Sequence, residues 1–309
     1  MTNRPAAPLF ATINVTTACN LSCPYCYCSP FPKRQMAYED FVAVVDALTD
    51  LHVFYAMVSG GEPFLNPSIE SMIRYASEKI DHLMVLTNGT RLSPRRIRML
   101  GEVANGGASV SVQVSLDSCD PGVNEQTRRH TQSVLDCIHA LSRAKISVVL
   151  STVVTRHNVS SIVDMVRTLR GVVRHFHVMT VEDVQGRPGV RESLSADQKE
   201  LGKLWTALRK MRREWKLAMD IPADGCTARG SAHGAPCSAA FTHIVIDPWL
   251  DVRPCDRLTN VSLGNLRTAS MHDIWNGTAA KEVLGSPLPL CTLAAHYECP
   301  DREETLLPG

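Results

Sequence analysis

Residues 9–28 read LFATINVTTACNLSCPYCYC, an apolar run followed by four cysteines in ten residues. The run is rich in β-branched and apolar residues and predicts a buried first strand. Cys19, Cys23 and Cys26 then form a CxxxCxxC spacing on a tight loop at the carboxyl end of that strand. Three thiolates this close together favour one iron–sulfur cluster, in which one iron stays open to another ligand. A zinc site is the alternative for the same three thiolates, and Cys28, outside the spacing, is predicted to be a buried or surface thiol.

Further strand-like runs alternate with helical patterns and predict the fold class. The strands are expected at 54–61, 82–89, 109–117, 147–155 and 174–181, and amphipathic helices at 38–50, 66–79 and 132–144. Six such strand–helix units connected by right-handed crossovers give an α/β fold with a parallel sheet, here a partial (β/α)6 barrel. Asn66 followed by Pro67 predicts the start of the helix over 66–79.

The pattern changes after Val181. A basic helix is expected over 195–216, and residues 241–255 predict a β-hairpin that turns near Asp247 and Pro248. We therefore expect two domains: residues 1–220, a barrel with a bridging helix, and residues 221–309, a small domain containing the hairpin.

Composition narrows the class of protein. The chain has 309 residues, 44% of them hydrophobic and 20% charged, and a formal net charge of +1. This balance gives no reason to expect nucleic acid or a membrane as a partner, and no apolar run is long enough to cross a bilayer. The amino-terminal segment has no signal-peptide pattern, so a cytoplasmic location is expected. Because thiols stay reduced there, the 11 cysteines favour metal binding over disulfides.

Two motifs together resemble a known family. The CxxxCxxC spacing after strand one, with 59-SGGEP-63 at the end of strand two, resembles the radical S-adenosylmethionine (SAM) superfamily. The resemblance implies a [4Fe–4S] cluster whose open iron binds SAM. One electron from the cluster then cleaves SAM, and the 5′-deoxyadenosyl radical abstracts hydrogen from a substrate.

The resemblance also assigns SAM binding to particular residues. They are Tyr25, Gly60, Gly61, Glu62, Asn88, Ser115, Asp117 and Arg128. Two alternatives stay open: Ser115 and Asp117 could simply cap the loop after strand four, and Arg129 could take the role of Arg128.

The last third of the chain carries a second group of cysteines. Cys237, Cys255, Cys291 and Cys299, with the segment 264-GNLRTASMHDIW-275, resemble the twitch domain, a short form of the SPASM domain. The resemblance implies that these four cysteines hold one auxiliary [4Fe–4S] cluster. Cys226 is a competing ligand, and a structural zinc is the alternative occupant. The family's hairpin glycine, five residues before the second cysteine, is Leu250 here.

The overall layout resembles dehydrogenases and epimerases of aminoglycoside pathways such as those of spectinomycin and hygromycin B. The expected substrate is therefore a carbohydrate or aminocyclitol, whose secondary alcohol is oxidised to a ketone while the auxiliary cluster takes the electron. Glu182 and Asp183, after strand six, are the candidate groups for binding this substrate or taking its proton. An external donor such as flavodoxin or ferredoxin is expected to supply the first electron. The alternatives are an epimerase, disfavoured because no cysteine follows strand six, and a maturase that modifies a ribosomally made peptide.

Overall fold

The structure is a computed structural model of the whole chain. It describes residues 4–28, 31–107, 109–183, 189–222, 239–258 and 261–285. Within these residues, no helix has the length and apolar character needed to cross a membrane.

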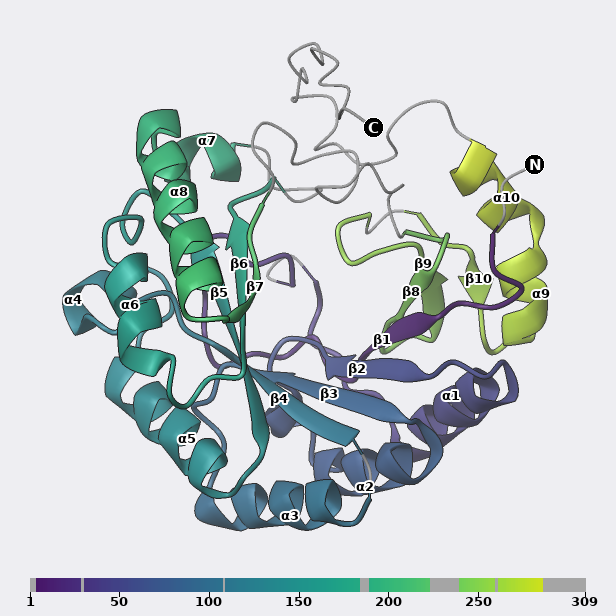
Figure 1. Cartoon of the computed structure of the whole chain (residues 1–309). Coiled ribbons are helices and arrows are strands. Elements are labelled where there is room, and N and C mark those ends of the chain that lie inside the picture. Colours follow the sequence, from purple (N-terminus) through teal and green to yellow (C-terminus); the bar gives the residue numbers. More distant parts are fainter. Residues whose placement is uncertain are drawn as a thin grey trace, which may run out of the picture.

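The described strands form one sheet (Figure 1). They are β1 (Phe10–Asn14), β2 (Tyr55–Ser59), β3 (His82–Thr87), β4 (Ser109–Ser115), β5 (Ser147–Val154), β6 (His175–Thr180), β7 (Ala218–Asp220), β8 (His243–Ile246), β9 (Asp251–Arg253) and β10 (Gly264–Asn265). Their order is β10-β9-β8-β1-β2-β3-β4-β5-β6-β7, so β10 and β7 are the edges. All neighbours from β8 through β1 to β7 pair in parallel, which confirms the predicted α/β partial barrel.

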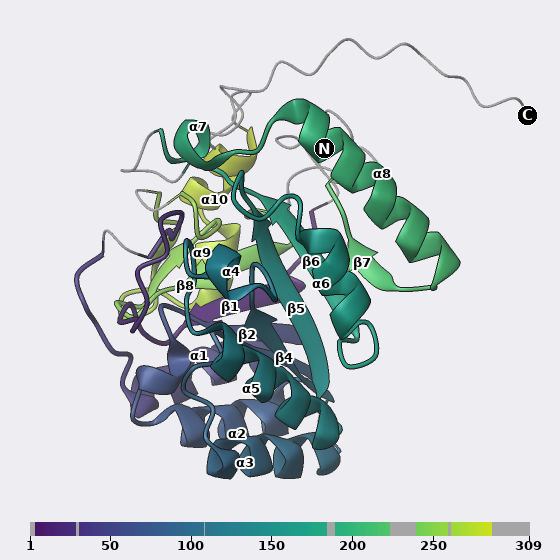
Figure 2. The same cartoon turned by 90° about the vertical axis from the view of Figure 1, so that its left-hand side faces the viewer.

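Helices cover the outer face of this sheet (Figures 1 and 2), except the short α7 (Val190–Leu194), which packs against Tyr25, Val153 and Met179. The helices are α1 (Tyr38–Asp50), the 3-10 turn η1 (Pro63–Leu65), α2 (Ile69–Lys79), α3 (Pro94–Asn105), α4 (Pro121–Asn124), α5 (Thr131–Arg143), α6 (Ile162–Leu169), α7, α8 (Gln198–Glu214), α9 (Met271–Asn276) and α10 (Thr278–Gly285). The strands alternate accordingly: on β4, Val110, Val112 and Val114 are buried in the core, whereas Gln113 and Ser115 on the opposite face are only partly buried.

The start of α2 differs from the prediction at Asn66. The helix begins at Ile69 rather than at residue 66, with Ser68 before it. Asn66 is buried, and its side-chain amide donates to the carbonyls of Val15 and Met36, each at 3.0 Å. This asparagine therefore fixes the chain after β1 to the chain before α2, a long-range role that local sequence does not reveal.

The predicted hairpin is present and belongs to the same sheet. β8 and β9 pair antiparallel around Asp247, whose carboxylate accepts the backbone N–H groups of Trp249 at 2.9 Å and Asp251 at 3.1 Å. Leu250 has φ 68°, the left-handed conformation that favours glycine. The turn therefore keeps the geometry that the missing glycine would have provided. β8 also pairs in parallel with β1, which places the hairpin next to the cysteine loop.

Candidate functional site

The cysteine loop leaves the carboxyl end of β1. Parallel α/β sheets place ligand sites at this edge, where the strand ends and the following loops meet. Backbone hydrogen bonds from the end of β2 fix the start of the loop: Gly61 N–H donates to Thr16 O at 2.7 Å, and Glu62 N–H donates to Ala18 O at 2.8 Å. The loop therefore starts from a rigid base formed by two strands.

The thiols of Cys19, Cys23 and Cys26 lie within electrostatic reach of one another. As they stand, no three cysteine, histidine or acidic side chains in the described ranges converge into a metal-binding geometry. Their chemistry nevertheless fits a cluster: Cys19 Sγ accepts the N–H of Leu21 at 3.4 Å and the side-chain amide of Asn88 at 3.8 Å, the hydrogen bonds that tune cluster sulfurs. Burial raises the pKa of Cys23 to about 11, and a bound metal would lower it by stabilising the thiolate.

Gly60 and Gly61 make room for this loop. A Cβ on Gly60 would lie 2.2 Å from Thr16 O, and one on Gly61 would lie 2.3 Å from Ala18 O. Gly60 also has φ 141°, which other residues rarely adopt. These are contacts with backbone, which cannot swing aside as a side chain can. Both glycines are therefore required for the close approach of the end of β2 to residues 16–18, which lead into Cys19.

We expect Gly61→Ala to destabilise the protein by about 1–3 kcal/mol and to lower the iron content per chain, because the added methyl group would push the cysteine loop away. Gly202→Ala is the matched control, since Gly202 lies in α8 with nothing within 4 Å of the added Cβ. Alanine there should be neutral or slightly stabilising. Thermal unfolding and iron analysis measure both effects, and equal behaviour of the two variants would contradict the steric argument.

Glu62 connects the ends of β2 and β3. It is fully buried, and its carboxylate accepts Phe64 N–H at 3.2 Å, Thr87 Oγ1–H at 2.8 Å and Asn88 N–H at 2.8 Å. Burial raises its pKa, and these hydrogen bonds oppose the rise. Asn88 in turn donates to Asn20 Oδ1 at 3.1 Å, in the cysteine loop. Both residues therefore support the loop in this structure, and their direct contact with SAM remains a prediction.

Tyr25, Asp117 and Arg128 form a polar cluster behind the loop, in which Asp117 is fully buried and the other two are partly buried. The hydroxyl of Tyr25 donates to Asp117, and Arg128 Nε donates to the other oxygen of Asp117 at 3.0 Å. The backbone N–H of Val153 also donates to Asp117, at 3.1 Å. Burial would lower the pKa of Arg128, but the facing Asp117 carboxylate raises it overall. Arg129 is exposed, so the structure brings Arg128 rather than its neighbour to the loop.

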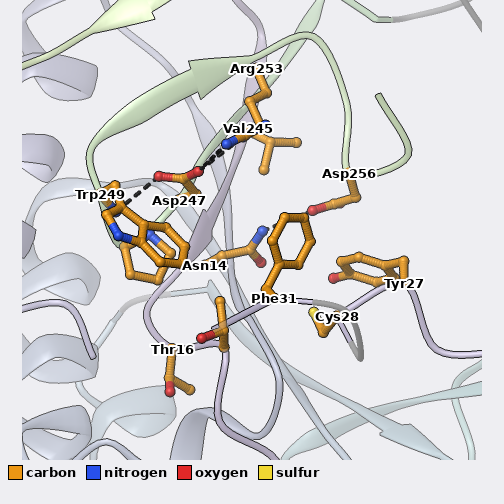
Figure 3. A pocket seen from close by; sticks show the side chains of 12 residues that line it. Asn14, Thr16, Tyr27, Cys28, Phe31, Val245, Asp247, Trp249, Arg253 and Asp256 are labelled. Carbon is orange, nitrogen blue, oxygen red and sulfur yellow. Dashed lines mark hydrogen bonds and ion pairs between the residues drawn. The ribbon is translucent and has the colours of Figure 1, made fainter. Parts of the chain in front are cut away.

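A small pocket opens between β1, the cysteine loop and the hairpin (Figure 3). Its volume of about 30 Å³ has room for a water molecule rather than for a substrate. Asn14 Nδ2 donates to Asp256 Oδ1 at 2.8 Å across it, while Asn14 Oδ1 is buried without a hydrogen-bond partner in the described part of the chain. Burial raises the pKa of Asp256 to about 6. Cys28 lines the same pocket, and its thiol is hydrogen-bonded to Cys26.

Asp256 was missed by the sequence analysis. A buried carboxyl group with a shifted pKa next to a cluster loop is a recurrent feature of functional sites. Its position directly after Cys255 was the available signal, but its partner Asn14 lies 242 residues away in the chain.

Both predicted catalytic acids already have interaction partners in this structure. Glu182 forms an ion pair with Arg257, which follows the hairpin. Asp183 Oδ1 accepts the backbone N–H of Arg191 at 2.9 Å, at the start of α7. Glu182 therefore ties the end of β6 to the segment after Cys255, and Asp183 fixes a helix start.

A row of polar side chains, one from each of the neighbouring strands β4 to β7, crosses the inner face of the sheet. It does not include Glu182 or Asp183. In the strand register Ser115 is paired with Ser151, Ser151 with His177, and His177 with Asp220. Asp220 Oδ2 lies 3.1 Å from His177 Nδ1 and 2.9 Å from His175 Nε2. Hydrogen bonds from the two histidines lower the pKa of Asp220, and the carboxylate raises that of His175. The row leads from a predicted SAM contact to a partly exposed His–Asp pair at the edge of the sheet.

Of the four predicted ligands of the auxiliary cluster, the described residues include only Cys255. Cys255 lies after β9 and is partly buried. Cys237, Cys291, Cys299 and the competing Cys226 lie outside the described residues. The assignment of all four ligands stays a prediction.

The radical SAM superfamily profile matches residues 13–169, just over half of the chain. The chain belongs to the radical SAM superfamily. A second profile, the SPASM iron–sulfur cluster-binding domain, matches residues 237–300. The protein is thus a radical SAM enzyme with a SPASM domain. The first domain binds SAM and a [4Fe–4S] cluster, and the second is an auxiliary iron–sulfur cluster-binding domain.

Several known proteins are similar to this radical SAM chain. AlbA of Bacillus subtilis, an antilisterial bacteriocin subtilosin biosynthesis protein, is 29% identical over 291 residues, covering 91% of this chain and 62% of AlbA. The solved structure of Streptococcus suis SuiB bound to its precursor peptide SuiA superposes with a TM-score of 0.77 at 17% identity, covering 92% of this chain and 68% of SuiB. BtrN in complex with AdoMet and 2-DOIA superposes with a TM-score of 0.50 at 16% identity, covering 89% of this chain and 84% of BtrN. The chain spans less than two thirds of the length of AlbA.

The comparisons bear on two expectations from the sequence. The matching profile confirms a SPASM-type domain, and its short twitch form with one auxiliary cluster stays a prediction. The expected link to aminoglycoside pathways finds no support: three of the similar proteins are named as a bacteriocin biosynthesis protein, a sporulation killing factor maturation protein and a mycofactocin maturase.

Proposed function

We propose that this chain is a maturase that modifies a precursor peptide by SAM-dependent hydrogen abstraction. The observation that carries the proposal is the 29% identity to a bacteriocin biosynthesis protein across 91% of the chain. When bound at Cys19, Cys23 and Cys26, the cluster supplies the electron that cleaves SAM. The peptide-modifying alternative therefore replaces dehydrogenation of an aminocyclitol as the favoured function.

The inner face of the barrel is compatible with a peptide. β7 and β10 are the edges of the described sheet, so the sheet does not close into a full barrel. The polar row from Ser115 to Asp220 lies across this inner face and ends at the β7 edge. Hydroxyl, imidazole and carboxylate groups in a row offer both donors and acceptors to the polar groups of a peptide backbone.

Product analysis tests the proposal. The reduced enzyme, SAM and synthetic peptides encoded by short reading frames beside the gene are incubated without oxygen, and a panel of aminocyclitol precursors is run in parallel. We expect 5′-deoxyadenosine together with a mass change in a peptide. A ketone product two mass units lighter from an aminocyclitol, with every peptide unchanged, would contradict the proposal and restore the dehydrogenase.

We assign Asp256, in place of Glu182 and Asp183, to proton acceptance after hydrogen abstraction. Because its pocket has room for a water molecule and not for a substrate, the proton would reach Asp256 through such a water. We expect Asp256→Asn to lower peptide product formation by about 10²-fold or more, the usual contribution of a positioned acid or base, while 5′-deoxyadenosine still forms. Asp183→Asn is the isosteric control, because its remaining carbonyl oxygen can still accept Arg191 N–H. A normal ratio of product to 5′-deoxyadenosine in Asp256→Asn would remove this residue from the reaction.

A further inference from the structure

A groove lies at the end of the barrel opposite the cysteine loop. It is lined by residues 145–148 and 170–174 and has a volume of about 500 Å³. These residues precede or begin β5 and β6, whereas the cysteine loop follows the carboxyl end of β1. None of the functional residues assigned above contributes to its walls.

The groove carries positive charge without acidic neighbours. Lys145, Arg170 and Arg174 line it, all three are exposed, and no Asp or Glu is among the lining residues. In the ranges that the structure describes, none of these three cations has a carboxylate within 4.0 Å. The whole chain has a net charge of only +1, so this is a local concentration of positive charge.

One of the cations is held in place. The guanidinium of Arg170 stacks over the ring of Trp215, 4.2 Å from its centroid, at the end of α8. Cations near the carboxyl end of a helix interact favourably with its dipole, which accounts for Arg170 after α6 and Lys145 after α5. That interaction does not account for Arg174, which directly precedes β6, nor for the groove that the three cations share.

We propose that this groove docks an acidic, extended segment of the substrate peptide. The identity of the partner, a substrate peptide, rests on the proposed maturase function. Its acidic character is inferred from the positive charge of the groove. An acidic electron-transfer protein offers the same charge, but docking here would leave the cysteine loop about 25 Å away, the approximate length of the eight-residue β5. An extended peptide spans such a distance with fewer than ten residues.

The binding test uses the full chain with its clusters and a fluorescein-labelled dodecapeptide of alternating Glu and Gly. The Gln–Gly counterpart serves as the neutral probe. We expect the acidic probe to bind at low salt, to weaken steeply as salt is raised, and to bind at least about tenfold tighter than the neutral probe. K145E/R174E should weaken binding by about tenfold or more.

The matched control is R98E/K281E, which makes the same charge change at two exposed positions on α3 and α10, outside the groove. It should change the affinity by less than about twofold. Equal weakening in both double variants, or no binding of the acidic probe to the wild-type chain, would overturn the proposal. Because the probe needs no SAM and no reaction, this result is independent of whether a peptide is modified in the product analysis.

Discussion

The Cys23→Ala enzyme is expected to form no 5′-deoxyadenosine from SAM. Cys23 is buried on the loop that follows β1, within electrostatic reach of Cys19 and Cys26. A cluster that loses one of three protein ligands is not retained at a site built for three. Iron per chain should fall by about half, because the auxiliary cluster should remain. Iron analysis and chromatography of the SAM products measure both effects.

Cys28→Ala is the matched control. Cys28 is also buried, and its thiol lies against Cys26 and donates to Gly60 O at 3.4 Å. The CxxxCxxC spacing excludes it, so its alanine variant should keep the cluster and cleave SAM. Loss of the cluster in Cys28→Ala, or 5′-deoxyadenosine formed by Cys23→Ala, would contradict the division of the four cysteines into three ligands and one neighbour.

The barrel was predictable because its signals are local. The six predicted strands overlap β1 to β6, and the helix predicted over residues 38–50 coincides with α1, because apolar runs and amphipathic periodicity depend only on neighbouring residues. The hairpin was predictable for the same reason. β7 was not predicted, since three residues with one buried side chain give no usable pattern.

The sequence predicted only those site residues that stand together in one short motif. The cysteines and the glycine pair stand in short motifs, whereas the roles of their partners depend on pairs distant in sequence. Glu62 accepts hydrogen bonds from β3, and Asp256 reaches Asn14 on β1 because β8 pairs with β1. Glu182 and Asp183 were selected for their place after strand six, but charge alone does not reveal that each already has a partner.

Asp117→Asn is expected to lower the free energy of unfolding by about 3–5 kcal/mol, the usual cost of leaving one member of a buried ion pair unpaired. Asp117 is fully buried and its partner Arg128 has a side chain only 13% exposed, so the cation cannot turn to water. The variant would also weaken the hydrogen bond that holds Tyr25 behind the cysteine loop. Thermal and denaturant unfolding of the purified enzyme measure the loss.

The double variant Asp117→Asn/Arg128→Gln separates the charge from the packing. Removing the orphaned cation should recover part of the stability that the single variant loses, because the double-variant cycle isolates the pair. Arg129→Gln, at an exposed neighbour, should change the free energy of unfolding by less than about 0.5 kcal/mol. A double variant no more stable than Asp117→Asn would show that the buried pair does not account for the loss. Normal stability but lost SAM binding in Asp117→Asn would instead favour the direct cofactor contact that the family resemblance predicts.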